Sequence, residues 1–227
     1  MSLLYIISTP IGNRQDITLR ALEIFNLVDY LLCEDTRKTK LLLDFYQIKK
    51  MPVLVSFYEP VEEQKIPQVV DWLKEGKNVG LVTNAGTPLV SDPGFKLVRE
   101  CVKENIQVVP IPGASAILSA LVVSGLPTDK FTFLGFLPKK EGKKEKLLKE
   151  ARYTVIAYES PFRLIKTLVM LQKLFPERQI VICRELTKKF EEIARGKPEE
   201  LVKKFSQGKV KGEVVILLGP GIEVIQE

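Results

Sequence analysis

The chain has 227 residues, of which 45% are apolar and 27% charged, and its formal net charge is +6. This length suffices for one large domain or two small ones, each with a buried core. The chain has no histidine, which excludes imidazole acid–base catalysis, Ser-His-Asp and Cys-His nucleophiles and most transition-metal sites. We expect no bound metal, and catalysis has to use carboxylates, lysine, tyrosine, backbone dipoles or a reactive cofactor.

The three cysteines, Cys33, Cys101 and Cys183, each lie within an apolar stretch and far from one another in the sequence. Their spacing matches neither a disulfide framework nor a zinc site, so we expect three buried thiols. The sequence contains no run of about 18 uncharged apolar residues, so no membrane-spanning helix is expected. The first residues lack a basic segment and are better interpreted as a strand than as a signal peptide. We therefore expect a cytoplasmic protein.

Apolar and amphipathic segments alternate along the first half, which is typical of α/β architecture. Strands are predicted at residues 3–8, 30–33, 52–56, 79–83 and 108–111. Helices are predicted at 18–27, 39–45, about 66–75 and 114–123, with one more that begins near residue 95. Asp16 or Thr18 is placed to cap the first helix. Pro67 is expected in the first turns of its helix. Phe95, Val98 and Val102 are expected to face the core.

A domain boundary is predicted near Pro112, giving domains at 1–112 and 113–227. The second half repeats the alternation, with strands at 131–134, 153–158, 180–183, 190–194 and 213–218 and helices at 143–151 and 198–205. Ser160 and Pro161 are expected to begin a further helix, as N-cap and first-turn proline. The fold class predicted is therefore α/β with two α/β domains.

Three loops rich in glycine, proline and small residues follow apolar strands. They are residues 9–13 (TPIGN), 84–94 (NAGTPLVSDPG) and 112–116 (PGASA). Such residues let the backbone approach a ligand closely while the prolines keep the loop stiff. Ligands of open α/β sheets bind beyond the carboxyl ends of the strands. The three loops therefore predict a cradle for a small molecule.

Two common nucleotide-binding loops are missing from the sequence. The first loop is TPIGN, not the G-x-G-x-x-G pattern of a dinucleotide site, and no G-x-x-x-x-G-K-[ST] segment occurs. This argues against NAD-dependent chemistry and nucleoside triphosphate hydrolysis.

The loops combine with further motifs, in order along the chain, into one family pattern. These are CEDTR at 33–37, GFLP at 135–138, YESPFRL at 158–164, CRELTKKFEE at 183–192 and GEVV at 212–215. Over nearly its whole length the chain resembles the ribosomal RNA small subunit methyltransferase I family of the tetrapyrrole methylase superfamily. The resemblance implies two α/β domains with S-adenosylmethionine in the cleft between them, and a homodimer. It implies methylation of a cytidine ribose 2′-hydroxyl in the decoding region of small-subunit (16S) ribosomal RNA, as naked RNA or in the 30S subunit.

The same resemblance implies a set of cofactor-binding residues. In the first half these are Pro10, Ala85, Gly86, Thr87, Leu89, Ala114 and Ser115, and in the second half Tyr158, Glu159, Ala194 and Gly212. Two features depart from the family pattern. Asn84 stands where the family usually has aspartate, and the histidines often found in three of its motifs are missing here.

A ribose hydroxyl is a weak acid, so methyl transfer to it needs a proton acceptor or a nearby cation. Glu34, Asp35 and Arg37, after the second strand, are the catalytic candidates, with either acid as acceptor and Arg37 binding phosphate or stabilising developing charge. Alternatively, they form a helix-capping acid pair and a surface ion pair. Asp92 either orients the substrate or caps the following helix.

A lysine-rich stretch follows the GFLP motif: Lys139, Lys140, Lys143, Lys144, Lys146 and Lys149. It fits an RNA backbone, or a solvated helix with i,i+4 ion pairs, because glutamates are interspersed. Phe57 and Tyr58 either stack on a base or belong to the core. Two other functions stay open, a tetrapyrrole C-methyltransferase and a non-catalytic RNA-binding protein of the same fold. The first loop disfavours the former, since porphyrin methylases typically have a glycine-rich loop there.

Overall fold

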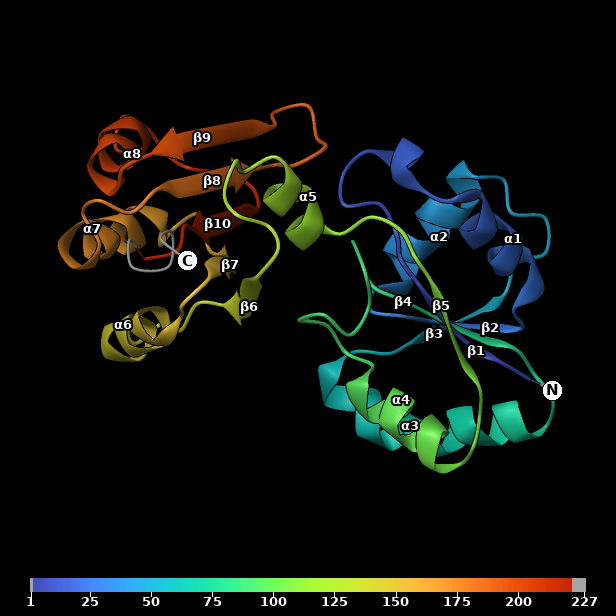
Figure 1. Cartoon of the computed structure of the whole chain (residues 1–227). Helices are drawn as coiled ribbons and strands as arrows, with labels where there is room; N and C mark the ends of the chain where they lie inside the picture. Colours follow the sequence, from blue (N-terminus) through green and yellow to red (C-terminus); the bar gives the residue numbers. More distant parts are fainter. Residues whose placement is uncertain (1, 222–227) are drawn as a thin grey trace. The chain divides into compact units, whose positions relative to one another are not determined.

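The computed structural model describes residues 2–221, which divide between Ser115 and Ala116 into two compact units. Each unit is a five-stranded sheet covered by helices, and Figure 1 labels the elements. Pro112 and the division after Ser115 lie in the same segment, which links the last strand of the first unit to the first helix of the second. Mixed α/β architecture with two sheets is what the alternating pattern predicted.

The sheet of the first unit is entirely parallel, with strand order β3-β2-β4-β1-β5. Its strands are β1 (Leu4–Ile7), β2 (Tyr30–Cys33), β3 (Val53–Ser56), β4 (Val79–Val82) and β5 (Val108–Ile111). Between them lie a short 3-10 helix η1 (Arg14–Asp16), α1 (Leu19–Leu27), α2 (Thr36–Phe45), α3 (Glu59–Lys74) and α4 (Phe95–Lys103). The central strands are apolar throughout because helices cover both faces of a parallel sheet.

Two apolar clusters fill the two faces of this sheet. On one face Phe25 of α1 and Leu43 of α2 pack with residues of β1 and β2. On the other face Leu73 of α3 and Leu97 of α4 pack with Leu81 of β4. The helix pairs therefore lie on opposite sides of the sheet, the doubly wound arrangement, as Figure 1 shows.

The second unit has a mixed sheet with strand order β6-β7-β10-β8-β9. Its strands are β6 (Phe131–Phe136), β7 (Thr154–Glu159), β8 (Ile180–Arg184), β9 (Glu192–Gly196) and β10 (Val214–Leu218), and its helices are α5 (Ala116–Val122), α6 (Glu141–Glu150), α7 (Leu164–Leu174) and α8 (Pro198–Phe205). Strands β6 and β7 are parallel, and the other neighbouring pairs are antiparallel.

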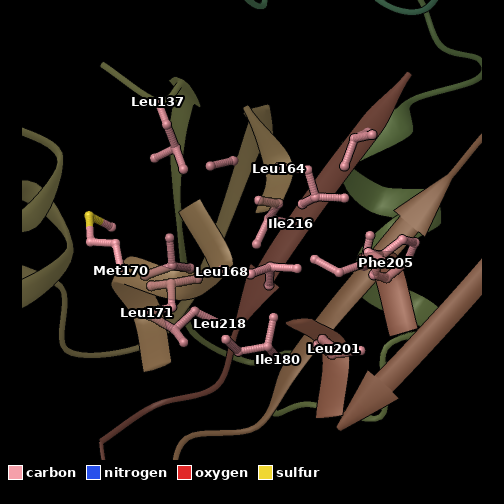
Figure 2. Close-up of a cluster of buried hydrophobic side chains, with 14 of the residues drawn as sticks. Leu137, Leu164, Leu168, Met170, Leu171, Ile180, Leu201, Phe205, Ile216 and Leu218 are labelled. Atoms are coloured by element: carbon pink, nitrogen blue, oxygen red, sulfur yellow. The ribbon is translucent and has the colours of Figure 1, made fainter. Parts of the chain in front are cut away.

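The core of the second unit lies between its sheet and the helices α7 and α8. Figure 2 shows Leu168 and Leu171 of α7 and Leu201 and Phe205 of α8 in one cluster with strand residues that include Ile216 and Leu218 of β10. Each fully buried side chain of this kind contributes about 1.5–3 kcal/mol to folding.

Some local predictions were wrong. Helix α3 begins at Glu59, with Pro60 in its first turn, so Pro67 lies inside the helix instead of in its first turns. In α4 the buried residues are Leu97 and Cys101, spaced i,i+4. Of the three residues expected to face the core, only Val98 packs against it, partly buried, whereas Phe95 and Val102 are 62% and 65% exposed. Helix α7 begins at Leu164, and Ser160 belongs to the turn before it, where its carbonyl accepts a hydrogen bond from Arg163 N at 2.9 Å.

The prediction of three buried thiols is confirmed. All three cysteines are free and at most 1% exposed. Burial raises the pKa of Cys33 and of Cys101 to about 11 and that of Cys183 to about 12. The thiols therefore stay protonated and unreactive at neutral pH. Within residues 2–221, no helix combines the length and apolar character needed to cross a bilayer.

Candidate functional site

The candidate site lies at the carboxyl edge of the first sheet, where the chain switches direction. Strands β1 and β4 are neighbours in the order β3-β2-β4-β1-β5. The connection leaving β1 runs to β2 on one side, and that leaving β4 runs to β5 on the other. Ligands of open α/β folds bind at such switch points, beyond the carboxyl ends of the strands. The first two predicted loops leave the sheet here.

Hydrogen bonds tie the three predicted loops together. Thr9 and Gly86 exchange two backbone hydrogen bonds, of 2.9 and 3.0 Å. The hydroxyls of Ser8 and Thr87 are 2.9 Å apart, and Thr87 Oγ1 donates to the carbonyl of Ala114 at 3.3 Å. Thr87 therefore links the loops after β1 and β5 through its own loop. The structure brings these three segments together as the sequence predicted.

The loop between β4 and α4 has an unusual backbone. Leu89 and Ser91 have φ angles of 71° and 67°, and Gly86 and Gly94 have φ angles of 85° and 125°. Positive φ costs a non-glycine residue about 1–3 kcal/mol, and such strain concentrates at functional sites. A Cβ at Gly94 would lie only 2.5 Å from Leu81 Cδ2 and 2.9 Å from Leu89 Cδ1, so this glycine is sterically required.

Glu62 of α3 binds the end of the same loop, where α4 begins. Its side chain is 4% exposed, and Oε1 accepts hydrogen bonds from Gly94 N at 3.1 Å and Lys96 N at 3.2 Å. It satisfies the first amide groups of α4, which have no cap from their own segment. The alternative that Asp92 caps this helix is therefore wrong, because Glu62 accepts these hydrogen bonds. The Asp92 carboxylate is not needed as a cap.

Asp92 and Glu34 form an acidic pair beside the loops. Burial raises the pKa of Asp92 to about 6, and the negative charge of Glu34 adds to the shift. Glu34 follows β2, and its Oε2 accepts a hydrogen bond from Asn84 N at 3.3 Å. A carboxyl group with a pKa near the working pH suits proton transfer.

Asp35 and Arg37 are engaged with each other and with α2. Asp35 Oδ1 accepts from Arg37 N at 3.0 Å, the N-cap position of the helix. The Arg37 guanidinium contacts both carboxylate oxygens, at 3.2 and 3.0 Å. Hydrogen bonds from Arg37 lower the pKa of Asp35 to about 2. Asp35 is thus a weak base held as a cap, while the Arg37 side chain is 88% exposed.

The predicted cofactor residues of the second unit have mixed environments. Tyr158 packs edge-on against Phe133, with ring centroids 5.1 Å apart. Ala194 is 5% exposed within the core cluster. Gly212 has φ +88°, and a Cβ there would meet the Glu185 carboxyl carbon at 2.4 Å.

The remaining residue of that set, Glu159, is 2% exposed and already bound by protein groups. Oε2 accepts from Lys144 Nζ at 3.1 Å and from Thr167 Oγ1 at 2.6 Å. Oε1 accepts from Ser160 N at 2.8 Å and forms an ion pair with Arg163 at 2.5 Å. The carboxylate of Glu159 therefore has a structural role within the second unit, which leaves only the backbone groups of this residue to contact a ligand.

Sequence reasoning missed the functions of Glu62 and Lys144. Both are single charged residues on amphipathic helices, where the pattern indicates a solvated side chain. They are nevertheless 4% and 5% exposed. Lys144 is one residue of the lysine-rich stretch, so no local signal separates it from its solvated neighbours. Phe57 is 0% exposed, so of its two interpretations, stacking on a base or packing in the core, the second is confirmed.

Comparisons with known proteins agree on one family. Residues 3–202 match the tetrapyrrole (corrin/porphyrin) methylases. Ribosomal RNA small subunit methyltransferase I of Thermotoga maritima is 44% identical over 96% of this chain and 98% of its own length, and that of Bacillus subtilis is 42% identical over 100% and 78%. The fold is similar to that of Thermus thermophilus uroporphyrin-III C-methyltransferase complexed with S-adenosyl homocysteine, with a TM-score of 0.63, 16% identity and coverage of 100% and 99%.

Proposed function

Because the chain belongs to the tetrapyrrole methylases and, within them, to the ribosomal RNA small subunit methyltransferase I family, we propose that it methylates a cytidine ribose in small-subunit RNA. The methyl donor is S-adenosylmethionine, and the acceptor is the 2′-hydroxyl of a cytidine in the decoding region. The observation that carries the proposal is the joining of three loops at the switch point of the first sheet.

The loop residues fit this donor. Glycine and small side chains at these positions let a ligand approach the loop backbone closely, and Gly113 has its backbone against Ser8, where a Cβ would lie 2.9 Å from Ser8 Cβ. The residues proposed to hold the donor are Pro10, Ala85, Gly86, Thr87, Leu89, Ala114 and Ser115, with Tyr158, Glu159, Ala194 and Gly212 from the second unit. When bound, S-adenosylmethionine supplies an electrophilic methyl group, so the reaction needs neither histidine nor metal.

The protein's own contribution is positioning and proton transfer. Holding the hydroxyl in line with the methyl carbon is worth about 7–11 kcal/mol. The carboxylate pair of Asp92 and Glu34 would accept the proton that the ribose hydroxyl loses on methylation. Asp92 is suited to accept it because its pKa is raised to about 6 by burial and by Glu34. Arg37, oriented by Asp35, binds an RNA phosphate.

The partner proposed is small-subunit ribosomal RNA, naked or within the 30S subunit, and the reaction takes place in the cytoplasm. The net charge of +6 supports a polyanionic partner. We also propose a homodimer, as the resemblance implies. Light scattering after gel filtration tests this, and a monomeric mass at working concentrations would contradict it.

Two rival functions make different predictions. A tetrapyrrole C-methyltransferase shares the fold, but a likeness at 16% identity supports the fold alone. A non-catalytic RNA-binding protein would not need the strained loop at Leu89 and Ser91. Calorimetric titration with S-adenosylmethionine addresses the second rival, because a non-catalytic protein would show no affinity.

The function is tested by supplying purified protein with S-adenosylmethionine carrying a radioactive methyl group. Unmodified small-subunit RNA, 30S subunits and uroporphyrinogen III are offered as separate acceptors. We expect label in RNA and none in the tetrapyrrole, and nuclease fragments should locate the methyl on a ribose. Label in uroporphyrinogen III with none in either RNA sample would overturn the proposal.

A further inference from the structure

A second surface lies at the carboxyl ends of the parallel strands β6 and β7 in the second unit. Phe131 to Phe133 pair with Thr154 to Ile156, and Phe136 pairs with Tyr158, so the two strands end side by side. Each strand leads into a loop and then a helix, β6 into α6 and β7 into α7. Loops at the carboxyl ends of neighbouring parallel strands share one edge of the sheet.

A buried ion network fastens these two loops to each other. Lys144 of α6 donates to Glu159 Oε2 at 3.1 Å and to Thr167 Oγ1 at 2.6 Å, so α6 is tied to β7 and α7. Arg163 pairs with the same carboxylate, and its NH1 donates to the carbonyl of Leu137 at 3.2 Å. The loops are therefore held in a defined relative position.

Two aromatic rings stand exposed directly beside this link. Phe136 precedes Leu137 and is 63% exposed, and Phe162 precedes Arg163 and is 94% exposed. The Phe136 ring contacts Tyr158, with centroids 5.2 Å apart, so one side of it is supported. Each ring therefore offers an exposed apolar face that a ligand can cover.

Unpaired lysines flank the rings. Lys139, Lys140 and Lys143 are exposed, and among residues 2–221 they form no ion pair. By contrast, Lys146 and Lys149 of the same helix pair with Glu150 and Glu145. Aromatic rings that can stack on bases, next to cations that can bind phosphates, are the combination that single-stranded nucleic acids recognise.

We propose that this surface, consisting of Phe136, Phe162, Lys139, Lys140 and Lys143, binds single-stranded RNA. It rests on the proposed function in one respect, since the RNA is the strand that carries the methylated cytidine. The rings stack on unpaired bases of this strand, and the lysines bind its backbone phosphates. Duplex RNA binds more weakly here because its bases are stacked on each other and inaccessible.

The test measures binding of a short fluorescein-labelled single-stranded RNA by anisotropy. Phe162→Ala is expected to weaken binding roughly tenfold, because base–aromatic stacking is lost. The matched control is Phe95→Ala, which removes another exposed phenylalanine, 62% exposed on α4, and should leave affinity unchanged. Phe162→Trp should retain affinity, and its fluorescence should be quenched when RNA is added.

The lysines are tested by the salt dependence of the same binding. The double variant Lys139→Ala, Lys140→Ala should reduce the slope of log affinity against log salt by about 1–2. Lys203→Ala, which removes an exposed lysine of α8, should leave the slope unchanged.

The outcomes separate this proposal from the proposed function. If wild-type protein methylates RNA while Phe162→Ala and the double lysine variant bind and methylate it equally well, the surface proposal is wrong and the function stands. Duplex RNA binding as tightly as single-stranded RNA would also overturn the surface proposal. If wild-type protein transfers no methyl to RNA, the proposed function fails, whatever the anisotropy shows.

Discussion

Replacing Asp92 with asparagine tests the acidic pair at the candidate site. The raised pKa of about 6 means that the folded protein holds this proton more tightly than the unfolded chain, whose carboxyl titrates near the ordinary value of 3.8. Between these two pH values the folded state binds more protons, so stability falls as pH rises. The ionised carboxylate therefore destabilises the native state above about pH 6.

The size of this penalty follows from the shift. One pKa unit corresponds to about 1.4 kcal/mol, so the shift of about two units corresponds to about 3 kcal/mol at most. Solvent screening of this half-buried group reduces the figure to about 1 kcal/mol. Asp92→Asn should thus be more stable than wild type by about 1 kcal/mol at about pH 8, with no gain at about pH 3.5.

The assay is urea unfolding at both pH values, followed by far-ultraviolet circular dichroism. Asp35→Asn is the opposite-sign control. The pKa of Asp35 is lowered to about 2, chiefly by hydrogen bonds from Arg37, so its charge stabilises the folded state at neutral pH and that contribution is lost as pH falls toward 2. A stability gain for Asp92→Asn that is equal at both pH values would refute the reasoning.

The same variant makes a kinetic prediction. If Asp92 accepts the hydroxyl proton, wild-type methyl transfer should rise with pH through an apparent pKa near 6. Asp92→Asn should lose most of the rate and this limb of the profile, while still binding S-adenosylmethionine. An unchanged pH profile in the variant would remove Asp92 from proton transfer.

Three further substitutions test the packing. Lys144→Met leaves a buried carboxylate short of one cation and should cost about 3 kcal/mol in urea unfolding, whereas Lys146→Met, on the same helix but exposed, should cost little; equal costs would contradict the buried network. Gly94→Ala should abolish binding of S-adenosylmethionine in calorimetry because its Cβ would collide with Leu81, whereas Gly76→Ala, at φ +89° with open space, should only lower stability. Glu62→Ala should cost about 1–3 kcal/mol because the amides of Gly94, which is buried, and of Lys96, which is partly buried, lose their acceptor; a cost within error of zero would refute the capping role.

Element type followed from local pattern for most of the chain. Strands such as Tyr30–Cys33 and Val108–Ile111 are short apolar runs bounded by turn residues, which local pattern alone identifies. Helix faces were harder. Phe95 and Val102 fit an apolar stripe, yet the buried pair is Leu97 and Cys101, which pack with residues of β4 and α3 that are distant in the sequence.

At the candidate site, convergence of the loops was predictable because parallel strands bring their carboxyl ends to one edge. The partners of individual carboxylates were not. The sequence gives no sign that Asp35 and Asp92 differ in environment. In the structure a neighbouring guanidinium lowers the pKa of Asp35, whereas burial raises that of Asp92. Such differences depend on contacts between residues far apart in the chain, such as Glu34 with Asn84.

The central claim is that the joined loops serve methyl transfer to a ribose of small-subunit RNA. The most direct measurement is mass spectrometry of nuclease fragments of this RNA from cells with and without the gene. The account predicts that the decoding-region fragment with the gene is heavier by one methyl group on a cytidine ribose, and that the difference disappears without it. Identical fragments from both cells would contradict the account.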